Sequence, residues 1–177
     1  MQQDVIFAGF GGQGILLMGS ILAHAAMDLG YEVAWVPSYG AEMRGGTANC
    51  TVVISNRPIG SPIIRNPQHL VAMTRPSLEK FAPMVKPGGV ILINNSIIPV
   101  DSGRDDVDEI KVPANDIAIK VGSVKAANIV ALAAFVTRSK ILDYEKIIEC
   151  LKLEFGAREE LIKLNLKAME EGRKAAQ

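Results

Sequence analysis

The segment that most constrains the fold is a glycine-rich turn near the start of the chain. An apolar strand, residues 4–8, runs directly into Gly9-Phe-Gly-Gly-Gln-Gly14, and an apolar helical pattern follows. Such a turn between a buried strand and a helix exposes backbone N–H groups at the positive end of the helix dipole. Gly9, Gly11 and Gly14 fit the G-x-G-x-x-G pattern in the context where it binds nucleotides. We therefore expect Gly9, Gly11, Gly12, Gln13 and Gly14 to seat a phosphate or a similar anion.

The second strand argues against a nicotinamide dinucleotide as the ligand. Dinucleotide sites usually place an acidic side chain at the end of this strand, where it holds the ribose hydroxyls. Here the strand expected over residues 31–36 ends in Pro37-Ser38-Tyr39, and Glu32 lies at its beginning. Trp35, inside this strand, is expected in the core. The sequence thus predicts the anion seat without the ribose acid.

Apolar runs alternate with helical patterns along the rest of the chain. We expect strands over residues 48–54, 70–73, 89–94 and 109–113, and helices over residues 13–29, 77–85, 125–137, 143–155 and 158–173. Strands that alternate with helices and read as continuous apolar runs are typical of parallel sheets covered on both faces. The prediction is a single α/β domain over residues 1–177, with three layers, a mostly parallel sheet and a Rossmann-like start.

Composition excludes several classes of partner. The 19 basic and 19 acidic residues cancel, which leaves no electrostatic signature for nucleic acid. No apolar run approaches the roughly 18 residues of a membrane span. The two cysteines, Cys50 and Cys150, are far apart, too few for a cluster of cysteine ligands, and are expected as buried thiols in a reducing, cytoplasmic setting.

A second group of chemically distinctive residues follows the second strand. Within a few positions the chain places Tyr39, Glu42, Arg44, Gly45 and Gly46. In doubly wound sheets this loop lies beside the first one, at the carboxyl ends of the strands. Arg44 is suited to a phosphate and the two glycines to close backbone approach. The alternative is a surface Arg44–Glu42 pair with glycines that only shape a turn.

The remaining candidates are weaker. Ser123 is expected to cap a helix, and Lys125 and Asn128 would then lie on one helical face, within reach of the same crevice. His24 is expected on the first helix and His69 in a loop, neither with a catalytic partner. The acidic stretch at residues 101–108 lacks the spacing of a calcium loop and is expected to be a solvated loop.

Three motifs together carry a resemblance to a known family. Gly9-Phe-Gly-Gly-Gln-Gly14, Tyr39-Gly-Ala-Glu-Met-Arg-Gly-Gly46 and Pro58-Ile-Gly-Ser-Pro62 resemble the gamma subunit of 2-oxoacid:ferredoxin oxidoreductases. The resemblance covers essentially the whole chain. It implies an oxidative decarboxylation of a 2-oxoacid to an acyl-coenzyme A, with reduction of ferredoxin, by a complex in which this chain is not catalytic alone.

The resemblance also implies how cofactors and partners are divided. Thiamine diphosphate, magnesium and iron–sulfur clusters are expected only on companion chains, namely thiamine-binding alpha and beta subunits and a ferredoxin-like iron–sulfur subunit. This chain is expected to contribute part of the coenzyme A site through its glycine turn, with Arg44 countering phosphate charge. No catalytic residue and no metal ligand is assigned to it.

The substrate and two alternatives stay open at this point. Phe10 within the turn resembles the 2-oxoglutarate or branched-chain members more than the pyruvate members, and 2-oxoglutarate is expected. One alternative is a free-standing domain that binds NADP with its 2′-phosphate on Arg44. The other is a purely structural subunit whose glycine loops only allow tight packing.

Overall fold

The computed structural model describes residues 1–40 and 46–177, and its centre is a six-stranded sheet in the order β2-β3-β1-β4-β5-β6. The strands are β1 (Gln2–Phe10), β2 (Glu32–Tyr39), β3 (Thr47–Ser55), β4 (His69–Ala72), β5 (Val90–Asn94) and β6 (Asp108–Val112). β1, β4, β5 and β6 pair in parallel, while β3 runs antiparallel to both β1 and β2. The prediction of a mostly parallel sheet is confirmed.

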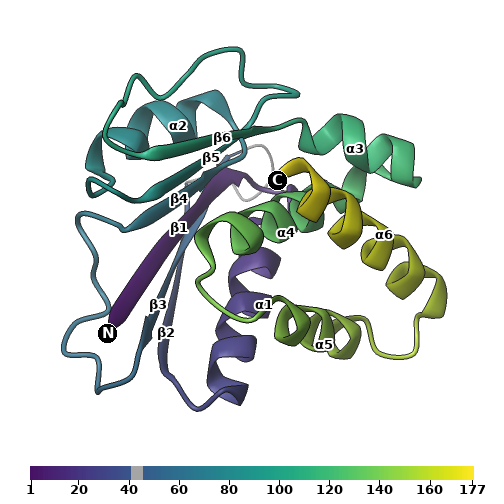
Figure 1. Ribbon diagram of the computed structural model, residues 1–177, viewed down its shortest axis with the longest axis horizontal. Coiled ribbons are helices and arrows are strands. Elements are labelled where there is room, and N and C mark those ends of the chain that lie inside the picture. The colour runs from purple at the N-terminus through teal and green to yellow at the C-terminus, as the bar shows by residue number, and fades with distance from the viewer. Residues whose placement is uncertain (41–45) are drawn as a thin grey trace.

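Helices cover both faces of the sheet (Figure 1). The helices are α1 (Ile15–Asp28), α2 (Arg75–Phe81), α3 (Ala114–Val121), α4 (Ala127–Ser139), α5 (Tyr144–Phe155) and α6 (Glu159–Ala175), with short 3-10 turns at Ala82–Met84 and Val124–Ala126. α2 covers one face, where a smaller core includes Leu78, Ile91 and Ile93. α1 and α4 cover the other, where the larger core lies. The three-layer α/β prediction is therefore confirmed.

Close packing around α4 explains the small residues in its sequence. Ten consecutive residues of this helix, 127–136, are buried, because it lies between the sheet and α6. Phe135 meets Phe7 of β1 edge to face, with ring centroids 5.8 Å apart. A Cβ on Gly172 of α6 would lie 2.3 Å from the carbonyl oxygen of Val130, so glycine is required at this crossing. The buried interior thus anchors α4, whose first turn reaches the glycine turn.

Several local expectations were wrong. β2 continues to Tyr39 through Pro37, which is tolerated because β2 is an edge strand. For the same reason Trp35 is 41% exposed instead of forming part of the core. α3, directly after β6, was not predicted. His69 is not in a loop: it begins β4, is buried, and its Nδ1 accepts a hydrogen bond from the N–H of Val90.

Two further expectations can be compared with the structure. Cys50 and Cys150 are both buried free thiols, as expected, and burial raises the pKa of Cys50 to about 12. Among the helices that the structure describes, none is both long and apolar enough to cross a membrane.

Candidate functional site

The glycine turn lies between the end of β1 and the start of α1, at the carboxyl edge of the parallel strands. Gly14 has a left-handed backbone, with φ of 72°, and no side chain caps the first turn of α1. Within the described ranges, no residue accepts a hydrogen bond from the backbone N–H groups of Gly12 or of residues 14–17. These five donors stand at the positive end of the α1 dipole, which is the arrangement that binds anions.

The side chain of Gln13 stabilises the glycine turn through hydrogen bonds. Its Oε1 accepts a hydrogen bond from the N–H of Phe10 at 2.7 Å, and its Nε2 lies 3.5 Å from the carbonyl oxygen of Met73. A Cβ on Gly9 would lie 2.4 Å from that Oε1 and 2.7 Å from Ile15. Gly9 is therefore required by the position of Gln13, and the Gln13 carboxamide shapes the turn.

Asn128, at the start of α4, holds the end of the turn. The residue is 3% exposed, its Nδ2 donates to the carbonyl oxygen of Gly14 at 3.3 Å, and its Oδ1 accepts from the N–H of Ile129 at 2.9 Å. A Cβ on Gly14 would lie 2.2 Å from Nδ2 of Asn128. Gly14 and Asn128, which are 114 positions apart in the chain, are therefore in a contact that leaves no room for a side chain at position 14.

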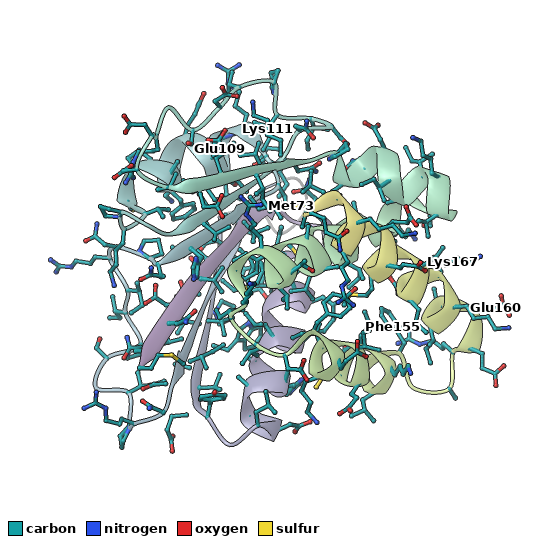
Figure 2. The ribbon with its side chains drawn as sticks, in the orientation of Figure 1. Met73, Glu109, Lys111, Phe155, Glu160 and Lys167 are labelled. Atoms are coloured by element: carbon teal, nitrogen blue, oxygen red, sulfur yellow. The ribbon has the colours of Figure 1, made fainter. Side chains whose placement is uncertain are left out.

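Two hollows adjoin the turn, and Gly12 lines both. The first, of about 170 Å³, is lined by Gly12, Gln13, Met73, Asn115, Val124, Lys125 and Ala127. It lies between β1 and β4, where the order of the sheet reverses, and such switch points are where open α/β sheets bind ligands. Met73, just past β4, lies near the centre of the molecule (Figure 2). The second, of about 420 Å³, is lined mainly by apolar residues, among them Phe10, Leu16 and Tyr39.

The predicted residues divide between these hollows. Lys125 lines the first hollow and Tyr39 the second, while the carbonyl oxygen of Gly46 accepts a hydrogen bond from the N–H of Gly11 at 2.8 Å. Ser123 caps the 3-10 turn before α4 as expected, because its Oγ accepts from the N–H of Lys125. Glu42, Arg44 and Gly45 lie outside the described residues.

Sequence analysis missed a pair of asparagines at the same edge of the sheet. Asn94, the last residue of β5, is fully buried, and its Nδ2 donates to Oδ1 of Asn115 at 2.9 Å. Its Oδ1 accepts from the N–H of Ala114 at 3.1 Å, which fixes the start of α3. The sequence contains a pattern that predicts this position, because Asn94 is a polar residue at the end of an apolar strand. Polar residues there lie at the carboxyl edge of a parallel sheet, where ligand sites form.

The charge that the described residues contribute to the hollows is positive. Lys125 is the cation among the described lining residues, and those residues include no Asp or Glu. The acidic stretch lies elsewhere, and two of its carboxylates form ion pairs: Asp106 with Arg104 of the same loop at 2.6 Å, and Asp108 with Arg138 of α4 at 2.6 Å. These pairs lower the pKa of both carboxyl groups. In the described ranges no group of His, Cys, Asp or Glu residues is placed to hold a metal ion.

Comparison with known proteins identifies the family. The family described as "Pyruvate ferredoxin/flavodoxin oxidoreductase" matches residues 4–175. The chain belongs to this family. It is 43% identical to the ketoisovalerate oxidoreductase subunit VorA of Methanothermobacter thermautotrophicus over 95% of its own length, but it spans only 35% of that longer relative.

Solved structures of the family share the whole fold. The gamma subunit of a keto/oxoacid ferredoxin oxidoreductase from Geobacter sulfurreducens is 29% identical, with a TM-score of 0.85, and the match covers 98% of each chain. The 2-oxoglutarate:ferredoxin oxidoreductase of Magnetococcus marinus, solved with 2-oxoglutarate, coenzyme A and succinyl-CoA, is 26% identical with a TM-score of 0.89. That match covers 99% of this chain and 31% of the longer one.

Proposed function

We propose that the chain is a gamma-type subunit of a 2-oxoacid:ferredoxin oxidoreductase, an enzyme that converts a 2-oxoacid, coenzyme A and oxidised ferredoxin into an acyl-coenzyme A, carbon dioxide and reduced ferredoxin. The family membership and the end-to-end match to a gamma subunit support this proposal. Thiamine diphosphate, magnesium and iron–sulfur clusters belong on companion alpha, beta and ferredoxin-like subunits. In agreement with this, the chain has two cysteines, which lie on β3 and α5 and are both buried.

Within that complex, the proposed role of this chain is to hold part of coenzyme A. The observation that carries it is the glycine turn, with five backbone N–H groups that have no acceptor within the described ranges and two hollows that adjoin it. Coenzyme A combines phosphates with a long, largely uncharged arm. The N–H groups and Lys125 suit a phosphate, and the apolar hollow beside Tyr39 suits the less polar portion. Gln13 and Asn128 keep the turn in shape, and Arg44, with Glu42, Gly45 and Gly46, remains part of the proposed site.

The 2-oxoacid has two candidates. The 43% identical relative is named for ketoisovalerate, whereas 2-oxoglutarate is expected from Phe10. Phe10 is 36% exposed beside the glycine turn and lines the apolar hollow. An assay with both oxoacids and pyruvate, on the complex that copurifies with the tagged chain under anaerobic conditions, decides between them.

The test of the coenzyme A role is the Lys125→Ala variant in the assembled enzyme. Loss of one charge-assisted contact costs about 1.5–3 kcal/mol, so the KM for coenzyme A should rise about tenfold or more while the KM for the oxoacid stays constant. Lys152→Ala is the matched control, because Lys152 is an exposed residue of α5, and it should change neither value. Equal coenzyme A KM values for wild type and Lys125→Ala would remove Lys125 from the site. Binding of NADP by the isolated chain would instead favour the free-standing nucleotide-binding alternative.

A further inference from the structure

A third hollow lies at the opposite end of the sheet from the glycine turn. It has a volume of about 450 Å³, and the residues that line it include Gln3, Leu29, Tyr31, Lys140, Leu142 and Asp143. They come from the start of β1 and from the connections α1–β2 and α4–α5. In Figure 1 the N-terminus marks this end of the sheet. Gln3 and Phe10 lie near opposite ends of β1, so at about 3.3 Å per residue roughly 23 Å separates the third hollow from the glycine turn.

Two opposite charges line the third hollow without pairing. Lys140 and Asp143 are both exposed, and neither forms an ion pair with the other or with any other residue that the structure describes. Lys146, on the next turn of α5, shows the usual behaviour, because it pairs with both Asp28 and Glu149. A cation and an anion that face one hollow separately complement a small molecule that carries both charges.

The helices beside Lys140 and Asp143 do not explain these two residues. Asp143 is the N-cap residue of α5, but its carboxylate accepts no hydrogen bond from the first turn, although such capping is the usual reason for an aspartate at this position. Lys140 ends α4 with a left-handed backbone, with φ of 53°, and is the one non-glycine residue with positive φ among those described. Glycine is the usual residue in that conformation. The two side chains are thus free to contact a ligand.

The carboxamide of Gln3 adds an unpartnered acceptor. Gln3 pairs with Ile54 of β3 and therefore faces the larger core. Its Oε1 is the one buried side-chain oxygen or nitrogen without a hydrogen-bond partner in the part of the chain that the structure describes. Its Nε2 makes only a weak contact with Sδ of Met1, at 3.9 Å. Because buried acceptors are normally satisfied, a donor from a bound molecule would complete this arrangement.

Apolar side chains form much of the remaining lining of the third hollow. Leu29, at the end of α1, is 44% exposed, and Leu142 is half-buried between the two charged residues. A ligand that matches these groups carries an ammonium, a carboxylate and an aliphatic side chain. We propose that the third hollow binds a free aliphatic α-amino acid. Asp143 and Oε1 of Gln3 accept from its ammonium, and Lys140 pairs with its carboxylate. Its side chain packs against Leu29 and Leu142.

The first experiment titrates the full chain with L-leucine by isothermal titration calorimetry at neutral pH. Isocaproate has the same carbon skeleton without the ammonium, and isoamylamine has the same side chain without the carboxylate. Each should bind about tenfold or more weakly than leucine, because each loses one charge-assisted contact. Absence of leucine binding, or equal affinity for leucine and either analogue, overturns the proposed site.

The second experiment repeats the leucine titration with Asp143→Asn and Lys140→Met. Asparagine caps a helix as well as aspartate does, and methionine keeps most of the length of the lysine side chain, so each substitution removes chiefly a charge. The Kd for leucine should rise about tenfold or more in each variant. Lys152→Met is the matched control, because Lys152 is exposed on α5 and lies outside the lining of the third hollow, and it should bind leucine as wild type does.

Gln3→Leu separates ligand binding from a structural role. Without leucine this variant should melt at a higher temperature than wild type, because it removes a buried acceptor that has no partner. It should nevertheless bind leucine more weakly. A higher melting temperature with unchanged leucine affinity would remove Gln3 from the site.

The outcomes leave the proposed function separately testable. Wild-type leucine affinity in both Asp143→Asn and Lys140→Met overturns the site, even where leucine binds elsewhere on the chain. Melting curves identify any variant that does not fold, and the comparison of leucine with its two analogues on the wild-type chain then decides. The coenzyme A role is tested by Lys125→Ala at the other end of the sheet, so failure of either proposal leaves the other intact.

Discussion

The two ends of the sheet are held by different kinds of side chain. At the glycine-turn end, uncharged carboxamides make the cross-links: Gln13 to Phe10, Asn128 to Gly14, and Asn94 to Asn115. At the opposite end, where β1 and β4 begin, titratable groups make the cross-links. Oδ1 of Asp4 accepts from the N–H of Gln68 at 2.6 Å, and Nδ1 of His69 accepts from the N–H of Val90 at 3.0 Å.

The difference suits the anion site that we propose at the glycine-turn end. A carboxamide both donates and accepts hydrogen bonds and stays neutral at any pH, so it can shape an anion site without repelling the anion. Asp4 and His69 are buried, and burial raises the pKa of Asp4 and lowers that of His69 to about 4. The hydrogen bonds at the end where β1 and β4 begin therefore depend on pH, whereas the carboxamide hydrogen bonds at the glycine-turn end do not.

The largest expected effect on stability tests the close contact between the glycine turn and α4. Gly14→Ala should lower the free energy of unfolding by about 4 kcal/mol, because a left-handed backbone and a collision with Asn128 add to each other. Gly12→Ala is the control: its φ is also positive, at 92°, but a Cβ there meets nothing within 4 Å, so the loss should be about 1 kcal/mol. Urea unfolding measures both. Equal losses would contradict a turn fitted to α4.

The next effect is the loss of stability in acid at the end of the sheet where β4 begins. Unfolded His69 takes up a proton near pH 6.5, but the folded protein does so only near pH 4. The unfolded chain therefore binds the proton first, and the free energy of unfolding should fall by about 3 kcal/mol between pH 7 and pH 4 through this residue. His69→Asn retains an acceptor for the N–H of Val90 without titrating in this range. Subtracting its pH profile from that of wild type isolates the histidine, and identical profiles would show that His69 is not the cause.

The smallest expected effect on stability tests why a neutral carboxamide is needed at Asn128. Asn128→Ala should cost about 2 kcal/mol of stability, because it removes the side-chain partners of the Gly14 carbonyl and of the Ile129 N–H. Asn128→Asp retains the acceptor for Ile129 but places a negative charge beside the proposed anion seat. In the assembled enzyme its KM for coenzyme A should therefore exceed that of Asn128→Ala. A lower KM for coenzyme A in Asn128→Asp than in Asn128→Ala would show that the glycine turn does not bind an anion.

Local patterns predicted the elements that are decided by local physics. The glycine turn, α1 and the buried strands β1 and β5 follow from apolar runs and from glycines placed between them. The antiparallel direction of β3 could not be predicted, because it depends on which strands pair and not on any one segment. The exposure of Trp35 could not be predicted for the same reason. A tryptophan within a strand is usually part of the core, and Trp35 is exposed because β2 is an edge strand.

The place of the glycine turn in the fold was predicted, but the contacts that build it were not. Tyr39 and Lys125 each line a hollow beside the turn, although not the same one, and their binding of a ligand stays a prediction. The contact between Asn128 and Gly14 joins residues 114 positions apart, and no local pattern reports such a pair. The roles of Gly9 and Gly14 likewise depend on the neighbours that a Cβ would meet, Gln13 in one case and Asn128 in the other.

The antiparallel course of β3 has a consequence for how the chain tolerates changes in length. One end of this strand follows Gly46, whose carbonyl holds Gly11, and the other ends at Ser55, whose hydroxyl holds Arg57. Deletion of a single residue within β3 would shift the register on one side of the deletion, turn the core-facing residues on that side, among Cys50, Val52 and Ile54, away from α1, and displace the attachment at that end. Insertions and deletions should accordingly be absent from residues 47–55 in functional variants, while the exposed loop at residues 99–107 accepts them.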